Sequence, residues 1–143
     1  MGPLAGLRIL DLTSVLMGPY ATQILGEMGA DVIKIEAPDG DVTRQIGPQR
    51  NPGMGPVFLN ANRGKRSVAM DLKAPGGAQA LLRLAESADV LVTNVRPRAM
   101  ARLGLGPEAL AAANPRLIQA ALVGFDQQGP YADRPAYDDL IQG

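Results

Sequence analysis

The side chains best suited to chemistry in this 143-residue sequence are cations, and they fall into two groups. Three lie within residues 63–66, immediately before a predicted strand. The other three, Lys73, Arg96 and Arg102, lie at or just past the ends of two predicted strands. Arg and Lys pair readily with phosphate oxygens, so the second group favours a polyanionic ligand. Residues 63–66 fit a phosphate contact and a solvated basic turn equally well.

The residues that are missing exclude several kinds of site. The sequence has no cysteine and no histidine, which removes disulfides, thiolate chemistry, a Ser-His-Asp triad and the commonest metal ligand. We therefore expect no metal site. Fourteen basic residues balance fourteen acidic ones, so the net charge gives no support for a nucleic-acid partner. No run of about eighteen apolar residues predicts a membrane span, and no secretion signal is recognisable, so we expect a cytoplasmic protein.

Residues 6–36 position the first part of the expected site, because they are typical of one strand–helix–strand unit. Residues 7–12 are a short apolar run of the kind buried in a parallel sheet. The helix opens at Gly18-Pro19 and stops at Gly29, and residues 31–36 form the second strand. Ligands of such sheets lie at the carboxyl ends of the strands, here residues 13–19 and 36–40. Helical spacing predicts one apolar face on this helix, made of Ala21, Ile24, Leu25 and Met28.

The rest of the chain continues the alternation of strands and helices, which predicts an α/β fold with a parallel sheet. After a long loop at 37–56, we expect strands at 67–72, 89–95 and 117–123 and helices at 78–87, 98–103 and 108–113. Residues 136–143 resemble the opening of another helix. We therefore expect one apparently truncated domain over residues 1–143.

A dinucleotide site is not favoured by the first strand–helix turn. The turn lacks G-x-G-x-x-G, since Gly18 is its one glycine between Thr13 and Tyr20. Glu36 closes the second strand, where a ribose partner would lie, but one feature without the other is a weak signal.

The motifs, in their order along the chain, resemble the start of the type III coenzyme A transferases, a family that includes formyl-CoA transferase and the carnitine CoA-transferases. The resemblance covers nearly the whole chain. It is carried by L-x-G-L-R-I-L-D-L-T, G-P-Y-A-T-Q-I-L-G-E-M-G-A-D-V-I-K-I-E, G-D-x-T-R, N-R-G-K-R-S-V-A-M-D-L-K, A-D-V-L-V-T-N-V-R-P, R-L-G-L-G, N-P-R-L-I and G-F-D-Q-Q-G-P-Y-A-D-R-P-A-Y-D.

This resemblance implies a Rossmann-like parallel sheet with flanking helices, the N-terminal part of an interlocked-dimer CoA-transferase fold. CoA or its thioester would be a substrate rather than a cofactor, and the second substrate would be a carboxylic acid. Some members have a polar residue at the position of Leu16 and a cation at that of Ala37, which leaves backbone contacts there. The implied CoA contacts are Leu16, Met17, Ala37, Met70, Asp71, Leu72, Lys73, Asn94, Val95, Arg96, Arg102, Tyr137 and Asp138.

The family's chemistry depends on one aspartate that attacks the thioester and forms an acyl-aspartyl anhydride. Its motif lies beyond residue 143 in a complete member. None of the late aspartates, Asp126, Asp133, Asp138 and Asp139, stands in that motif, so no catalytic residue is assigned and this chain alone is expected to be inactive.

Three alternatives to a CoA-transferase stay open. The 2-methylacyl-CoA racemases share the N-terminal pattern but resemble G-H-D where this chain has Tyr137-Asp138, and tyrosine, with a pKa of about 10, exchanges protons poorly near neutral pH. A non-catalytic module that binds CoA or acyl-CoA is the second. A structural fragment that folds only on a partner chain is the third.

Overall fold

The computed structural model describes residues 2–142, and a five-stranded parallel sheet forms its centre. The strands are β1 (Arg8–Leu12), β2 (Asp31–Glu36), β3 (Arg66–Ala69), β4 (Val90–Thr93) and β5 (Ile118–Ala121). Their order in the sheet is β3-β2-β1-β4-β5, and every neighbouring pair is parallel. The predicted Rossmann-like α/β sheet is confirmed, because this order is that of five strands in a doubly wound nucleotide-binding sheet.

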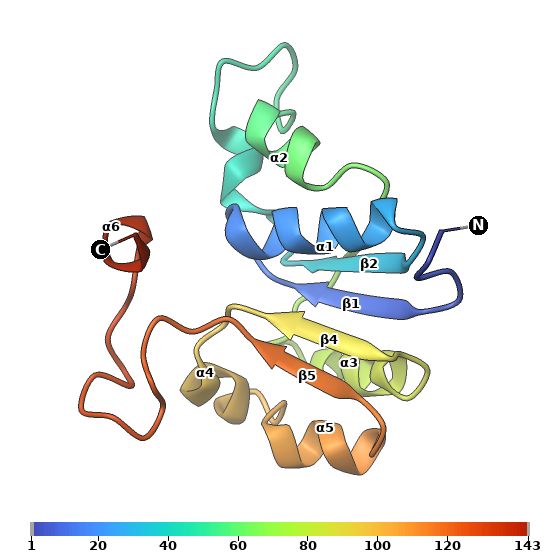
Figure 1. The fold of residues 1–143 in the computed structure, drawn as a ribbon, viewed down its shortest axis with the longest axis vertical. Helices are drawn as coiled ribbons and strands as arrows, with labels where there is room; N and C mark the ends of the chain where they lie inside the picture. Colours follow the sequence, from blue (N-terminus) through green and yellow to red (C-terminus); the bar gives the residue numbers. More distant parts are fainter. Residues whose placement is uncertain (1, 143) are drawn as a thin grey trace.

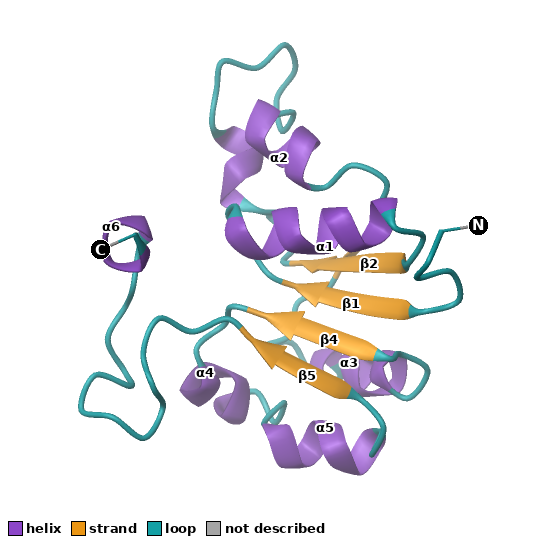
Figure 2. Cartoon of the chain, in the orientation of Figure 1, coloured by secondary structure: helices purple, strands orange, loops and turns teal. Residues whose placement is uncertain are grey.

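Helices cover the sheet on two faces (Figures 1 and 2). On one face lie α1 (Met17–Glu27), the 3₁₀ turn η1 (Val42–Gln45) and α2 (Pro56–Ala61). On the other lie α3 (Gly77–Ala85), α4 (Pro97–Arg102) and α5 (Pro107–Ala113). A last short helix, α6 (Asp138–Ile141), stands apart from both layers. No helix within residues 2–142 is long and apolar enough to cross a membrane.

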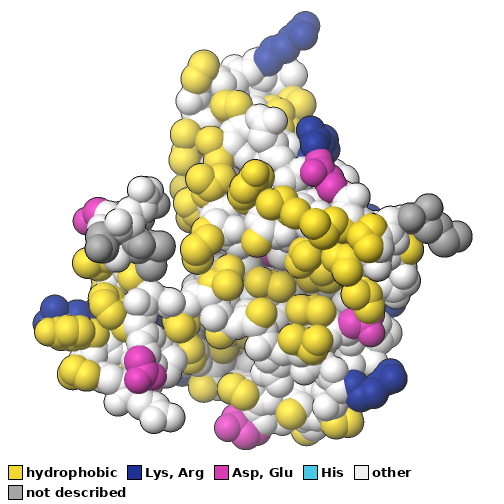
Figure 3. Space-filling view, in the orientation of Figure 1, with side chains coloured by type: hydrophobic (Ala, Val, Ile, Leu, Met, Phe, Trp, Pro, Cys, Tyr) yellow, Lys and Arg dark blue, Asp and Glu magenta, His cyan; other side chains and the backbone are white. Residues whose placement is uncertain are grey.

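The two faces of the sheet differ in chemistry. Toward α3, α4 and α5 the sheet presents Leu10, Leu12 and other aliphatic residues, which form the larger core with Leu81 and Met100. Toward α1 the core is small, with Ile9, Val32 and Val92 at its centre. Here β5 lies largely open, since 62% of Ile118 is exposed. Figure 3 shows hydrophobic side chains gathered over α1 and the strands beside it.

The most deeply buried positions of α1 are not the predicted apolar ones, although Leu25 is half-buried and packs against the small core. The buried residues are Gly18, Pro19, Thr22 and Gln23, whereas Ala21 and Met28 are exposed. The reason is that the sheet presents a charged group to this helix: Thr22 donates a hydrogen bond to the carboxylate of Asp11 (2.6 Å). A polar helix face therefore packs on a polar part of the sheet.

Several boundaries differ from the sequence prediction. The expected loop at 37–56 contains η1, and α2 was missed entirely. β3 ends at Ala69, so Met70 and the two residues after it follow the strand instead of lying in it. β4 and β5 are also shorter than predicted at both ends.

Candidate functional site

Most of the predicted CoA contacts lie along one edge of the sheet. Leu16 and Met17 follow β1, Ala37 follows β2, residues 70–73 follow β3, and residues 94–96 follow β4. Because these four strands are neighbours in a parallel sheet, their carboxyl ends form one continuous edge. Leu16 and Met17 are 52% and 54% exposed, so this loop is accessible from outside.

The second group of cations is also exposed near this edge. Lys73 lies in the turn after β3, where its N–H donates to the carboxylate of Asp71 (2.9 Å). Arg96 occupies the N-cap position of α4 without a side-chain capping hydrogen bond, and Arg102 lies in the last turn of that helix. All three residues are exposed to solvent, and their contact with an anionic ligand stays a prediction.

The cations at 63–66 serve a different purpose. Lys65 pairs with Asp11 (2.7 Å), Arg66 pairs with Asp31 (2.7 Å), and Arg63 pairs with a glutamate of α1. The Lys65 side chain is 2% exposed, so it is neither a solvated turn residue nor a phosphate contact. Each cation of this group already has an acidic partner within the chain.

The side-chain amide of Asn94 forms hydrogen bonds with the loop after β1. Its Oδ1 accepts a hydrogen bond from the N–H of Ser14 (3.1 Å), and its Nδ2 donates to the carbonyl of the same residue (2.9 Å). Asn94 was expected to contact CoA. The geometry gives it a part in holding the β1–α1 loop.

The carboxylate of Glu36 accepts hydrogen bonds from within the chain, so it is not available to a ribose. Arg44 donates two hydrogen bonds to its carboxylate (2.7 and 2.8 Å), Ser67 donates a third (2.8 Å), and the N–H of Asp41 donates a fourth (3.1 Å). Burial raises the pKa of this carboxyl group, but the four donors outweigh it and lower the pKa to about 2.

Two buried ion pairs lie between the sheet and the α1–α2 layer, and sequence reasoning missed both. Lys34 pairs with Asp41 (3.3 Å), and Lys65 pairs with Asp11. Burial raises the pKa of Asp11, but hydrogen bonds from Lys65, Thr13 and Thr22 lower it further than burial raises it. The period-two spacing of Lys34 and Glu36 along β2 was the available signal, since it puts both charges on one face of the sheet.

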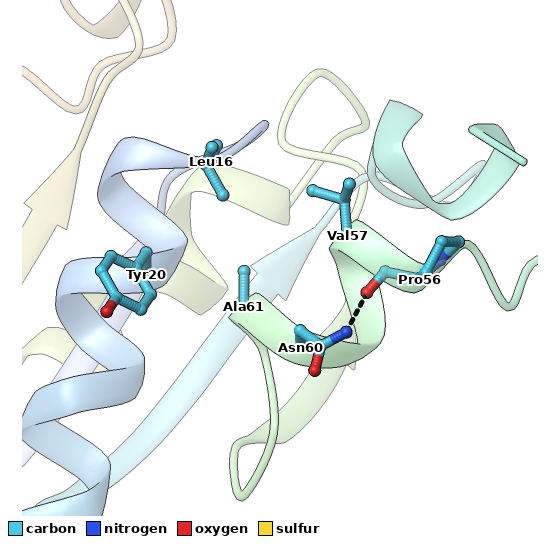
Figure 4. Close-up of a pocket in the computed structure, with 6 residues that line it drawn as sticks. All are labelled: Leu16, Tyr20, Pro56, Val57, Asn60 and Ala61. Atoms are coloured by element: carbon cyan, nitrogen blue, oxygen red, sulfur yellow. Dashed lines mark hydrogen bonds between the residues drawn. The ribbon is translucent and has the colours of Figure 1, made fainter.

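A groove of about 380 Å³ lies between the start of α1 and α2 (Figure 4). Leu16 and Tyr20 come from the α1 side, and Val57 and Ala61 from α2. Asn60 also lines the groove, but its Nδ2 donates to the carbonyl of Pro56 (2.8 Å). The walls can therefore shelter a nonpolar group and offer few polar partners.

The last two predicted contacts lie on the segment after β5. Tyr137 is 72% exposed, and Asp138 begins α6, although its side chain lies outside the part of the chain that the structure describes. In Figure 1 this segment lies on the side toward which the strands point. An exposed ion pair between Arg98 and Asp133 (3.1 Å) links it to α4. Within residues 2–142 no cluster of acidic side chains could hold a metal ion.

Comparison with known proteins gives a consistent result. Residues 4–143 match the description CoA-transferase family III. The chain is 45% identical, over 99% of its length, to a succinate–glutarate CoA-transferase of Agrobacterium fabrum, and 48% identical to an acetyl-CoA:oxalate CoA-transferase of Acetobacter aceti. It spans 37% and 36% of these two relatives.

Solved structures with the same fold agree. A CAIB/BAIF family protein from Brucella suis superimposes with a TM-score of 0.92 at 41% identity, covering 99% of this chain and 38% of that one. The crystal structure of Rv3272 from Mycobacterium tuberculosis gives 0.88 at 46% identity, covering 96% of this chain and 38% of that one.

Proposed function

Because this chain belongs to CoA-transferase family III, we propose that it forms the CoA-binding part of an enzyme that moves CoA between carboxylic acids. The observation that carries the proposal is the continuous edge at the carboxyl ends of β1 to β4, bordered by exposed cations. Relatives at 42–48% identity have names that describe CoA transfer, which favours transfer over racemisation.

In this proposal the CoA nucleotide lies along that edge. Lys73, Arg96 and Arg102 meet its phosphate groups as charge-assisted hydrogen-bond donors. The exposed Leu16, at the end of the β1–α1 loop, and Met17, the first residue of α1, contact the ligand. The remaining contacts are Ala37, residues 70–72, Val95, Tyr137 and Asp138, and residues 1–143 belong to one domain.

The chemical step in this proposal uses a carboxylate from beyond residue 143. That carboxylate attacks the thioester carbonyl and forms an acyl anhydride, and the C–S bond breaks to release CoA as the thiolate. The thiolate then attacks the enzyme's own carbonyl in the anhydride, so the anhydride C–O bond breaks, the first acid leaves as its carboxylate and CoA is held as a thioester of the enzyme carboxylate. The incoming acid attacks this thioester and expels the thiolate again, which forms a second anhydride. Attack of the thiolate on the new acyl carbonyl gives the product thioester and frees the enzyme carboxylate. The chain spans 37% of the succinate–glutarate CoA-transferase that it matches, and the proposal assigns to it the binding of CoA. The full-length protein is proposed to act as a homodimer.

Titration calorimetry of the chain with CoA, with NAD as the matched control, tests the proposal. We expect saturable CoA binding and no NAD binding, because the turn after β1 lacks the G-x-G-x-x-G fingerprint of dinucleotide-binding turns. A folded chain, judged by circular dichroism, that takes up neither ligand would refute the assignment of CoA to this edge. Binding of NAD in place of CoA would point to a dinucleotide protein.

A further inference from the structure

The loop between β1 and α1 is held at three consecutive residues, Thr13–Val15, by side chains from three other segments. Lys34 of β2 donates to the carbonyl of Thr13 (2.8 Å). Asn94, after β4, accepts from the N–H of Ser14 (3.1 Å) and donates to the carbonyl of Ser14 (2.9 Å). Asp41, before η1, accepts from the N–H of Val15, whose nitrogen lies 3.2 and 3.4 Å from the two carboxylate oxygens. We call Lys34, Asp41 and Asn94 the loop clamp.

The backbone that the clamp holds is strained. Val15 has a φ of 72°, and it is the only non-glycine residue with positive φ within residues 2–142. A β-branched side chain is especially unfavourable in this left-handed region, so such a conformation persists only where the surroundings impose it. Without its anchors, the loop would relax to an ordinary conformation and move the residues that follow.

Two members of the clamp are too deeply buried to touch a ligand. The side chains of Lys34 and Asp41 are 2% and 1% exposed, and they pair with each other at 3.3 Å. The same carboxylate also accepts hydrogen bonds from the N–H and hydroxyl of Thr43 (3.0 and 2.7 Å). Any effect of this pair on a ligand must therefore pass through the loop.

The residues that directly follow the clamped loop are the exposed Leu16 and Met17. Leu16 occupies the cap position of α1 without a side-chain hydrogen bond to the helix, so the N–H groups of the first turn are not capped by its side chain. Because both side chains are apolar, these two residues can offer a ligand polar contacts only through their backbone. Whether the backbone groups reach a ligand depends on the conformation in which the loop is held.

We propose that Lys34, Asp41 and Asn94 are positioning residues that fix the backbone of Leu16 and Met17 for the bound CoA thioester. The inference rests on the proposed function, since it requires CoA at this edge of the sheet. It assigns the buried Lys34–Asp41 pair a role in ligand affinity, in addition to its role in packing.

The test uses two clamp variants and one matched control of the full chain. Lys34→Met combined with Asp41→Asn removes both buried charges together, so neither is left unpaired. Asn94→Ala removes the third anchor and avoids the buried layer. The control is Asn114→Ala, a buried asparagine whose Nδ2 donates to the carbonyls of Ala85 and Ala88 (3.0 and 2.8 Å) near the opposite ends of the strands.

Two readouts separate loop position from overall stability. Amide hydrogen exchange of Ser14 and Val15, measured by NMR without ligand, reports the clamp itself. Calorimetry reports CoA affinity. We expect faster exchange at both amides and about tenfold weaker CoA binding in each clamp variant, the loss for a loop that spends about a tenth of its time in the binding form. Asn114→Ala should lower the unfolding midpoint while leaving both readouts unchanged.

Three other outcomes would each overturn a specific statement. If the clamp variants exchange faster but bind CoA as tightly as the parent chain, the clamp does not position the ligand and the proposed function stands. If exchange at Ser14 and Val15 is unchanged, the side chains do not hold the loop. If the parent chain does not bind CoA, the proposed function fails and this inference fails with it. If the double variant does not fold, Asn94→Ala carries the comparison.

Discussion

Replacing Glu36 by glutamine should reveal how much stability the buried charges contribute. The side chain is 4% exposed and receives four hydrogen bonds, two of them from Arg44. Its pKa of about 2 in the folded chain compares with an ordinary 4.5. A difference of about 2.5 pH units corresponds to about 3 kcal/mol of folding free energy at neutral pH.

The sign of the pH dependence follows from the lowered pKa. The stabilisation is complete above the unfolded pKa of 4.5 and is lost as the pH falls toward the folded value of about 2. Glutamine resembles the protonated carboxyl group, so Glu36→Gln should cost about 3 kcal/mol at pH 7 and only about 1 kcal/mol at pH 3. Urea unfolding of both proteins at pH 7, 5, 4 and 3, followed by circular dichroism, measures the gap.

Glu27→Gln is the matched control, because its ion pair with Arg63 is exposed. We expect it to change the unfolding free energy by less than about 1 kcal/mol at pH 7. The reasoning would be refuted if the difference in unfolding free energy between the parent chain and Glu36→Gln stayed constant from pH 7 to pH 3. The strength of the hydrogen bonds would then not depend on the charge of Glu36.

Two other predictions concern the cations. Arg102→Ala should weaken CoA binding by about 1–3 kcal/mol, which is typical of a charged hydrogen bond, whereas the control Arg83→Ala on α3 should leave the affinity unchanged. Equal affinities of the two variants in calorimetry would show that Arg102 does not contact CoA. Asp11→Asn should destabilise the chain by about 3–5 kcal/mol because it leaves Lys65 charged and buried without its partner. Adding Lys65→Met should recover much of that loss in urea unfolding, and no recovery would show that the charge of Lys65 is not the cause.

The sheet and its ligand edge were predictable because they depend on local patterns. Apolar runs such as residues 7–12 indicate buried parallel strands, and Gly29 marks the end of the first helix within two residues. Parallel topology then puts the loops after β1, β2, β3 and β4 at one edge, so the location of the candidate site follows from the element order alone.

The missed features depend on contacts between residues far apart in the sequence. The six-residue helix α2 has too little periodicity to be recognised, and it is fixed by Phe58, whose buried ring lies 3.7 Å from the guanidinium of Arg44. The Asp11–Lys65 pair joins residues 54 positions apart. The buried face of α1 was mispredicted for the same reason, since a charge on the sheet selects Thr22 over the apolar positions.

The strand order has a consequence for how the chain is made. Of the five strands in this sheet β1 leaves the ribosome first, yet it lies in the middle of the sheet, where Ile9 pairs with Val32 on one side and Val90 on the other. A nascent chain that has not yet reached β4 can pair only β1, β2 and β3, and it leaves one side of β1 without hydrogen-bond partners. Synthesis at about 5–20 residues per second makes this interval last several seconds, during which the open edge of β1 is a place for chaperones to bind.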